Sequence, residues 1–127
     1  IKNLQDNDLK NAWLYTMPQK PQNPILTLYF EKNSLITHFG LAIGYQRSVD
    51  DAFGDRFRIF KKPRTLTLET KDGFKQTIKL DNIKGMQYPS IQAMETNELK
   101  IYLDNVYEAE NPDFAISEIR LLGMELP

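Results

Sequence analysis

The 127-residue chain has the length of one ordinary domain, and its 41% hydrophobic and 26% charged residues are typical of a folded globular protein. A formal net charge of −1 excludes a broad electrostatic attraction to nucleic acid or to an anionic membrane, and no apolar stretch is long enough for membrane insertion. The lack of cysteine excludes disulfides, thiol catalysis and cysteine-ligated zinc. Because the chain starts at Ile1 rather than methionine, we expect residues 1–127 to be a single domain taken from a longer protein.

The first half of the chain carries several β-strand patterns. Ile25–Phe30 and Leu35–Tyr45 are rich in β-branched, aromatic and other apolar residues, a composition that favours strands. Thr65–Thr70 alternates polar and apolar residues, so Leu66 and Leu68 are expected to face a core.

A hairpin turn and three further strands follow. Lys71–Gly73 predicts a tight turn, because Asp-Gly supplies the positive φ that such turns need, and Phe74–Leu80 is the expected return strand. Leu99–Val106 and Ala115–Leu122 alternate again, whereas helical periodicity is limited to one short turn at Val49–Phe53. Seven or eight short strands separated by turn signals predict an all-β fold, an antiparallel β-sandwich or barrel.

The residue types give little indication of a catalytic site. His38 lies within a strand pattern, where a histidine is more often packed or half-exposed than a base. Asp50, Asp51 and Asp55 lie close in sequence, and a glycosidase-type carboxylate pair would need such residues. Acidic residues in a loop are more often solvated or turn-forming. We therefore expect no enzymatic activity.

Three polar segments bear on binding. Asp6, Asn7 and Asp8 place oxygen ligands within one turn, which suits calcium, but residue types alone favour an Asx turn capped by its own side chains. Residues 43–48 contain a Tyr-Gln-Arg sequence that can stack on a sugar ring and hydrogen-bond its hydroxyls, or simply end a strand with a snorkelling arginine. The basic run Arg56–Arg64 is interpreted as a solvated loop beside a strand.

Read in order, these segments resemble a known family. Asn3–Trp13 resembles the opening motif of discoidin-like domains, and Phe114–Gly123, with its Ile-Ser-Glu-Ile-Arg core, resembles their closing strand. Between them, Gly44–Ser48, the basic run, a Leu-x-Leu-Glu strand, Asp72–Gly73 and Val106–Tyr107 are similar in order to the NADase-type glycan-binding domain, a discoidin-related jelly roll. The resemblance covers nearly the whole chain.

This resemblance implies a galactose-binding-like β-sandwich that serves as a non-catalytic carbohydrate-binding or surface-attachment module of a larger exported bacterial protein, in an extracytoplasmic location. Its partner would be a glycan or cell-surface ligand, or another domain of the same polypeptide. The residues expected at the ligand are Tyr45, Gln46, Arg47, Asp55, Arg56 and Arg58. A structural calcium ion, found in the wider discoidin group, would be held by Asp6, Asp8 and Glu118. Glu118 alternates with core residues, so its burial would require a metal or an arginine as partner.

Two alternatives remain open from the sequence. A protein-interaction module, docking on a neighbouring domain or partner, would expose an apolar patch. That patch would include residues such as Phe53, Phe57, Ile59 or Phe60. A hydrolase, the less favoured alternative, would use the carboxylates of Asp50 or Asp51 with Asp55.

Overall fold

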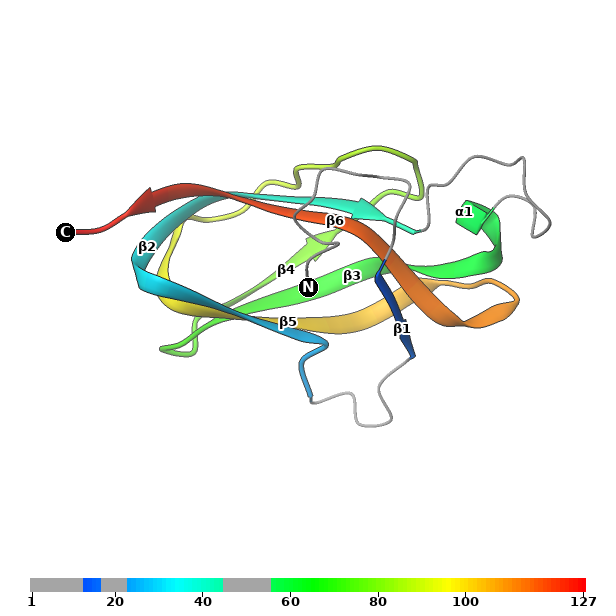
Figure 1. Ribbon diagram of the computed structural model, residues 1–127, viewed down its shortest axis with the longest axis horizontal. Helices are drawn as coiled ribbons and strands as arrows, with labels where there is room; N and C mark the ends of the chain where they lie inside the picture. The colour runs from blue at the N-terminus through cyan, green and yellow to red at the C-terminus, as the bar shows by residue number, and fades with distance from the viewer. Residues whose placement is uncertain (1–12, 17–22, 45–55) are drawn as a thin grey trace.

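The computed structural model describes residues 13–16, 23–44 and 56–127, which form an almost purely β structure (Figure 1). One helical turn interrupts the strands in this part of the chain. The elements are β1 (Trp13–Thr16), β2 (Leu26–Ile43), α1 (Arg56–Ile59), β3 (Phe60–Thr70), β4 (Lys75–Lys79), β5 (Met94–Tyr107) and β6 (Asn111–Glu125).

The six strands form two packed layers that share one strand. Their hydrogen-bonded order is β1-β6-β2-β5-β3-β4. The 18-residue β2 pairs with β5 in its first half and with β6 in its second, with an irregularity between Tyr29 and Ser34. Figure 1 shows β6 and the later half of β2 in one layer, and β3, β4 and β5 in the other. A short parallel pairing at Phe60 and Asn111 joins β3 to β6, whereas the other pairings are antiparallel, as predicted for a sandwich.

The core lies between the layers and follows the two-residue period of the strands. Leu66 and Leu68 of β3 are fully buried, which confirms the prediction for this strand. From the other layer, Phe39, Leu41 and Ile43 of β2 are also fully buried. Burial of each such side chain contributes roughly 1.5–3 kcal/mol, so the alternation of apolar residues holds the two layers together.

Three elements differ from the sequence-based expectation. β2 is one strand rather than two, because residues 31–34 contain neither glycine nor proline and the backbone stays extended through the bend. Phe74, expected in the return strand, lies in the hairpin turn and is 39% exposed; its N–H donates to Thr70 Oγ1 at 3.2 Å. The helical turn of the described residues is α1, and the turn expected at Val49–Phe53 lies outside them.

The segment between β4 and β5 (residues 80–93, the strap) is tied to β2 by one glutamine, which also fixes the beginning of the strap. The backbone of Gln87 exchanges two hydrogen bonds of 2.9 Å with Leu41 of β2. Its side-chain amide exchanges two further hydrogen bonds, both of 2.7 Å, with the backbone of Asp81. Gln87 therefore attaches the strap to β2 and holds the two ends of its first turn together.

A second glutamine holds the far end of the strap. The side-chain amide of Gln76 on β4 exchanges two hydrogen bonds of 2.9 Å with the backbone of Gln92. Between these two clamps, Tyr88 lies against β2 at Gly40, where a Cβ atom would approach Tyr88 Cε1 to 2.4 Å. The strap thus runs beside the sheets without forming a strand of its own.

Replacing Gln76 with alanine removes both hydrogen bonds of the second clamp. Because each such bond contributes about 0.5–1.5 kcal/mol, we expect Gln76→Ala to lower the free energy of unfolding in urea by about 1–2 kcal/mol. Gln92→Ala is the matched control, since only the backbone of Gln92 takes part, and its effect is expected to stay within about 0.5 kcal/mol. Equal effects of the two substitutions would contradict the clamp.

Candidate functional site

The end of the sandwich that carries α1 has a fixed junction at Gly44. Gly44 follows β2 with a φ of 74°. Its N–H donates to the carbonyl of Ala115 at 2.7 Å, and its carbonyl accepts from Ser117 Oγ at 2.6 Å. A Cβ atom here would lie 2.9 Å from Lys62 Cγ and 3.0 Å from Phe57 Cδ2. Both the backbone conformation and the space therefore require glycine.

Phe57 anchors α1 beside this junction and is 8% exposed. The ammonium of Lys62, itself only 5% exposed, donates to the carbonyl of Phe57 at 2.8 Å and lies 4.4 Å from the centroid of its ring. Lys84 Nζ, from the strap, lies 5.6 Å from the same centroid. An aromatic ring attracts cations at such distances, so this contact joins α1, β3 and the strap into one unit.

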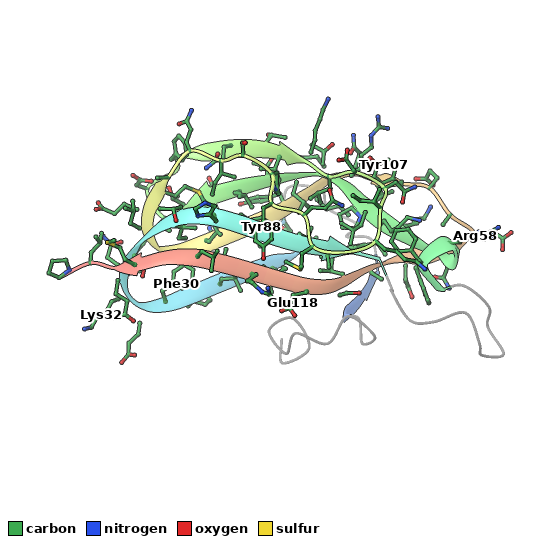
Figure 2. The ribbon with its side chains drawn as sticks, turned by 90° about the horizontal axis from the view of Figure 1, so that it is seen from above. Phe30, Lys32, Arg58, Tyr88, Tyr107 and Glu118 are labelled. Carbon is green, nitrogen blue, oxygen red and sulfur yellow. The ribbon has the colours of Figure 1, made fainter. Side chains whose placement is uncertain are left out.

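Further positive side chains lie in α1 and in the beginning of β3. Arg58 is exposed, and Figure 2 shows it at the extreme of the molecule, at the same end as Tyr107. Lys61 Nζ lies 2.5 Å from Glu108 Oε2, so this carboxylate compensates its charge. Arg64 is exposed and lies 5.5 Å from the ring centroid of Tyr107. We call the surface formed by Arg58, Arg64, Lys84 and Tyr107 the α1 end.

The structure describes part of the predicted ligand site. The side chain of Arg58 is described and reaches solvent at the α1 end. Arg56 has its backbone in α1, but its side chain is not among those described. The remaining predicted ligand residues, Tyr45, Gln46, Arg47 and Asp55, lie outside the described residues.

The interpretation of the basic run Arg56–Arg64 as a solvated loop is wrong. The run forms α1 and the beginning of β3, and Lys62 within it is buried. The apolar patch expected for a docking module also differs, because Phe57 is buried and Phe60 is only half-buried. Phe53 and the side chain of Ile59 are not among the described parts of the chain.

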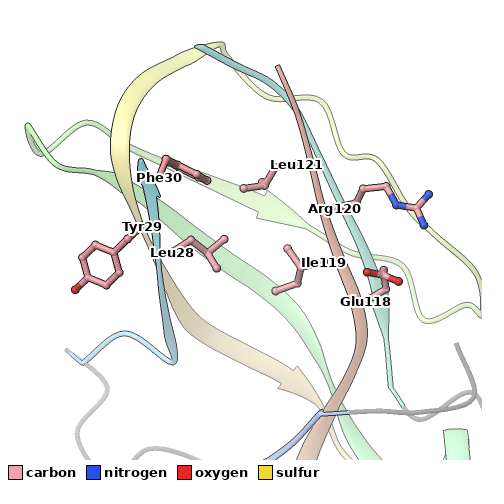
Figure 3. Close-up of a pocket in the computed structure, with 7 residues that line it drawn as sticks. All are labelled: Leu28, Tyr29, Phe30, Glu118, Ile119, Arg120 and Leu121. Atoms are coloured by element: carbon pink, nitrogen blue, oxygen red, sulfur yellow. The ribbon is translucent and has the colours of Figure 1, made fainter. Parts of the chain in front are cut away.

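A pocket of about 480 Å³ opens between the first half of β2 and β6. Figure 3 shows Leu28 and Phe30 of β2 facing Ile119 and Leu121 of β6, whereas Tyr29 points away from them. We call this opening the side pocket. The four facing side chains are apolar, so this part of the pocket extends the core.

The single histidine of the chain, His38, lies on β2. His38 is exposed, and its Nδ1 lies 2.9 Å from Thr37 Oγ1 of the neighbouring residue. No group of three or more histidine, aspartate or glutamate side chains is placed to hold a metal within residues 13–16, 23–44 and 56–127. None of the described helices has the length and apolar character needed to cross a membrane. The carboxylates of Asp50, Asp51 and Asp55 lie outside the described residues.

The model of the family described as "NAD glycohydrolase translocation F5/8 type C domain" matches residues 1–122. The chain belongs to this family. The membership confirms the discoidin-related resemblance of the opening, middle and closing segments.

A solved structure shows the same fold. It is a fragment of a protein from Bacteroides thetaiotaomicron that has been proposed to be a chitobiase. The match covers 100% of this F5/8 type C domain and 77% of that chain, with a TM-score of 0.61 and 16% sequence identity. At this identity the likeness concerns the fold, which is the predicted antiparallel β-sandwich. Among curated proteins, none matches this chain.

Glu118 of this F5/8 type C domain is 1% exposed, which confirms its predicted burial. Figure 3 shows Glu118 and Arg120 on the side of β6 opposite to Ile119 and Leu121. β1 joins β6 nearby, with Trp13 opposite Ile116. A buried carboxylate needs a compensating positive charge, so Glu118 fits either calcium or an arginine. The other two predicted ligands, Asp6 and Asp8, lie outside the described residues.

Gly44→Ala tests the junction of the α1 end. The added methyl group meets both a backbone with positive φ and the side chains of the anchor, so we expect a loss of about 2–4 kcal/mol in unfolding free energy. Gly73→Ala is the control, because Gly73 has a φ of 95° in the hairpin but open space around its Cα. If Gly73→Ala destabilised the domain as much as Gly44→Ala, steric contact at the junction would be refuted.

The calcium site that the sequence resemblance implies predicts a melting temperature that depends on a chelator. An ion bound to the folded state alone stabilises it in proportion to its occupancy, so EDTA should lower the melting temperature and added calcium should restore it. The same titration of Glu118→Gln should show no response to calcium, whatever the stability of the variant. A wild-type melting temperature that is identical with EDTA and with millimolar calcium removes the ion from this domain.

Proposed function

We propose that this F5/8 type C domain is a non-catalytic accessory module that attaches a larger exported protein to cell-surface glycans through the α1 end. The observation that carries the proposal is the exposed Arg58, presented by a turn whose neighbouring residue Phe57 is buried and held by Lys62. A guanidinium group binds carboxylate and sulfate oxygens through two parallel hydrogen bonds. Acidic sugars carry these groups.

The charge distribution at the α1 end supports acidic rather than neutral glycans. Glu108 compensates Lys61, and Arg58 and Arg64 are exposed cations. The half-buried ring of Tyr107 supplies an aromatic surface beside the guanidinium group of Arg64. Cations around an aromatic side chain combine charge recognition with stacking on the sugar ring.

The family supports an accessory role. Its description names a translocation domain of NAD glycohydrolases, and we extend translocation and surface attachment to this chain as part of the proposal. An extracytoplasmic location follows from such a role. The fold shared with the chitobiase-like fragment contributes no activity to the argument.

Arg58→Ala tests the glycan proposal. Loss of a charge-assisted hydrogen-bonding group should weaken binding to sulfated oligosaccharides about tenfold, as measured on a glycan array and by calorimetry with a heparin-derived hexasaccharide. Binding of the wild-type domain should also weaken as salt rises from about 0.05 to 0.5 M, because exposed charges are screened.

Lys32→Ala is the matched control for this experiment. Lys32 is also an exposed cation, with 65% of its side chain accessible, but Figure 2 shows it at the opposite end from Arg58. Its removal should leave binding unchanged. Absence of binding to every acidic glycan by a folded domain, or equal losses in the two variants, would refute recognition at the α1 end.

Docking on a partner protein is a second candidate function, favoured by apolar side chains exposed on β6. Leu122 is 48% and Met124 is 62% exposed, and both border a small cavity beside Phe30 and Leu121 of the side pocket. Cell attachment that persists in Arg58→Ala and after periodate oxidation of the glycans, but is lost in Leu122→Lys, would favour this function.

A further inference from the structure

The outward face of the β4-β3-β5 sheet carries a groove of about 560 Å³. Its volume lies within the range of about 300–1,000 Å³ that is typical of ligand sites. The three strands lie side by side in the layer opposite β6 (Figure 1). We call this the sheet-face groove, and its polar lining includes Thr67, Glu69, Lys75, Thr77, Tyr102 and Asp104.

Hydrogen bonds across three strands hold the middle of the groove. Thr67 on β3 lies opposite both Thr77 on β4 and Tyr102 on β5. Its hydroxyl donates to Asp104 Oδ2 at 2.6 Å and lies 3.1 Å from the hydroxyl of Thr77. One carboxylate oxygen of Asp104 is thus oriented by Thr67, which fixes the carboxylate at the groove.

A second carboxylate is fixed in the same way. The hydroxyl of Tyr102 donates to Glu69 Oε1 at 2.7 Å, and this bond raises the pKa of Tyr102 above its ordinary value. Lys75 Nζ lies 3.8 Å from Glu69 Oε2, which is too long for a direct hydrogen bond. The side chain of Glu69 is 18% exposed, so little of this carboxylate reaches bulk solvent.

The separation between Lys75 and Glu69 suits a hydroxyl group. A hydroxyl oxygen placed between them accepts a hydrogen bond from the ammonium and donates one to the carboxylate, as a bridging water would. Asp104 offers a further oriented acceptor for a second hydroxyl. Two carboxylates and one ammonium disfavour a polyanion, and the row of fixed acceptors disfavours an apolar ligand.

We propose that the sheet-face groove binds a neutral oligosaccharide through hydroxyl groups recognised by Glu69, Lys75 and Asp104. Ligand hydroxyls replace water at groups that are already oriented by Thr67 and Tyr102, so little side-chain entropy is lost on binding. The groove shares no residue with the α1 end, and it differs from that end in preferring neutral over acidic sugars.

NMR titration of the domain with neutral hexasaccharides of glucose, xylose, galactose and N-acetylglucosamine tests the proposal. At least one of them should shift the backbone amides of Thr67, Thr77 and Tyr102 in a saturable manner. Glu69→Gln removes the charge of one recognising carboxylate and should weaken that affinity about tenfold or more. Asp104→Asn should also weaken the affinity for the hexasaccharide. Because Asp104 is exposed, this variant provides the test if Glu69→Gln does not fold.

Glu98→Gln is the matched control, because Glu98 is a half-buried carboxylate of the same strand as Tyr102 but does not line the groove. It should leave the affinity unchanged. The proposal is overturned if no hexasaccharide shifts these amides, or if Glu98→Gln weakens binding as much as Glu69→Gln. Arg58→Ala separates the two surfaces: it should leave the neutral hexasaccharide affinity intact even where it abolishes binding of sulfated sugars.

Discussion

The backbone of β2 hydrogen-bonds to both layers of the sandwich, and its register constrains every strand around it. Residues 26–29 pair with β5, and residues 38–43 pair with β6. Because successive side chains point to opposite faces, Leu28 in the first stretch and Leu41 in the second are both buried in the same core. A slip of one residue in the first stretch would turn Leu26 and Leu28 to solvent. In the second stretch it would exchange the core side chains with those of the opposite face, which is buried as well. The bend between the two stretches therefore has to leave Leu28 before it and Leu41 after it facing the same core.

This constraint extends to the α1 end. Gly44 directly follows β2, and its hydrogen bonds to Ala115 and Ser117 attach it to fully buried positions of β6. Phe57 of α1 and Lys62 of β3 both lie against this glycine. A ligand contact at Arg58 is thus carried by a turn that is packed directly on the core. Such rigidity lowers the entropy that is lost when a partner binds.

Local alternation made much of the fold predictable from sequence. Leu66 and Leu68 were correctly assigned to the core, because these positions depend on a two-residue period within one strand. The burial of Glu118 was also predicted, but residues 114–119 are buried in succession, so a two-residue period does not account for it. The same period, extended backwards, would place both Lys62 and Arg64 inside, yet only Lys62 is buried. Register shifts next to position 65 change which residues of β3 face the core. Such shifts involve the neighbouring strand, so the residue pattern of β3 alone does not predict them.

The candidate sites were less predictable for a related reason. The bond from Ser117 to Gly44 joins residues 73 positions apart, and the sheet-face groove combines side chains from three strands. The family resemblance predicted ligand residues at the end of the sandwich that carries Arg58. It predicted neither the bond from Ser117 to Gly44 nor the sheet-face groove. Contacts of this kind depend on which strands pair and in which register, so they cannot be predicted from the sequence until the pairing is known.

The glutamine clamps have a consequence for association between molecules. Open sheet edges can recruit strands from other copies, and natural proteins shorten, charge or cover them. Within the described residues, β1 ends the sheet with only four residues. At the other edge, β4 carries exposed Lys75 and Lys79 and has the strap fastened beside it through Gln76. Both ends of the sheet are thereby poor templates for strand exchange, so many copies can gather on one surface without polymerising through their sheets.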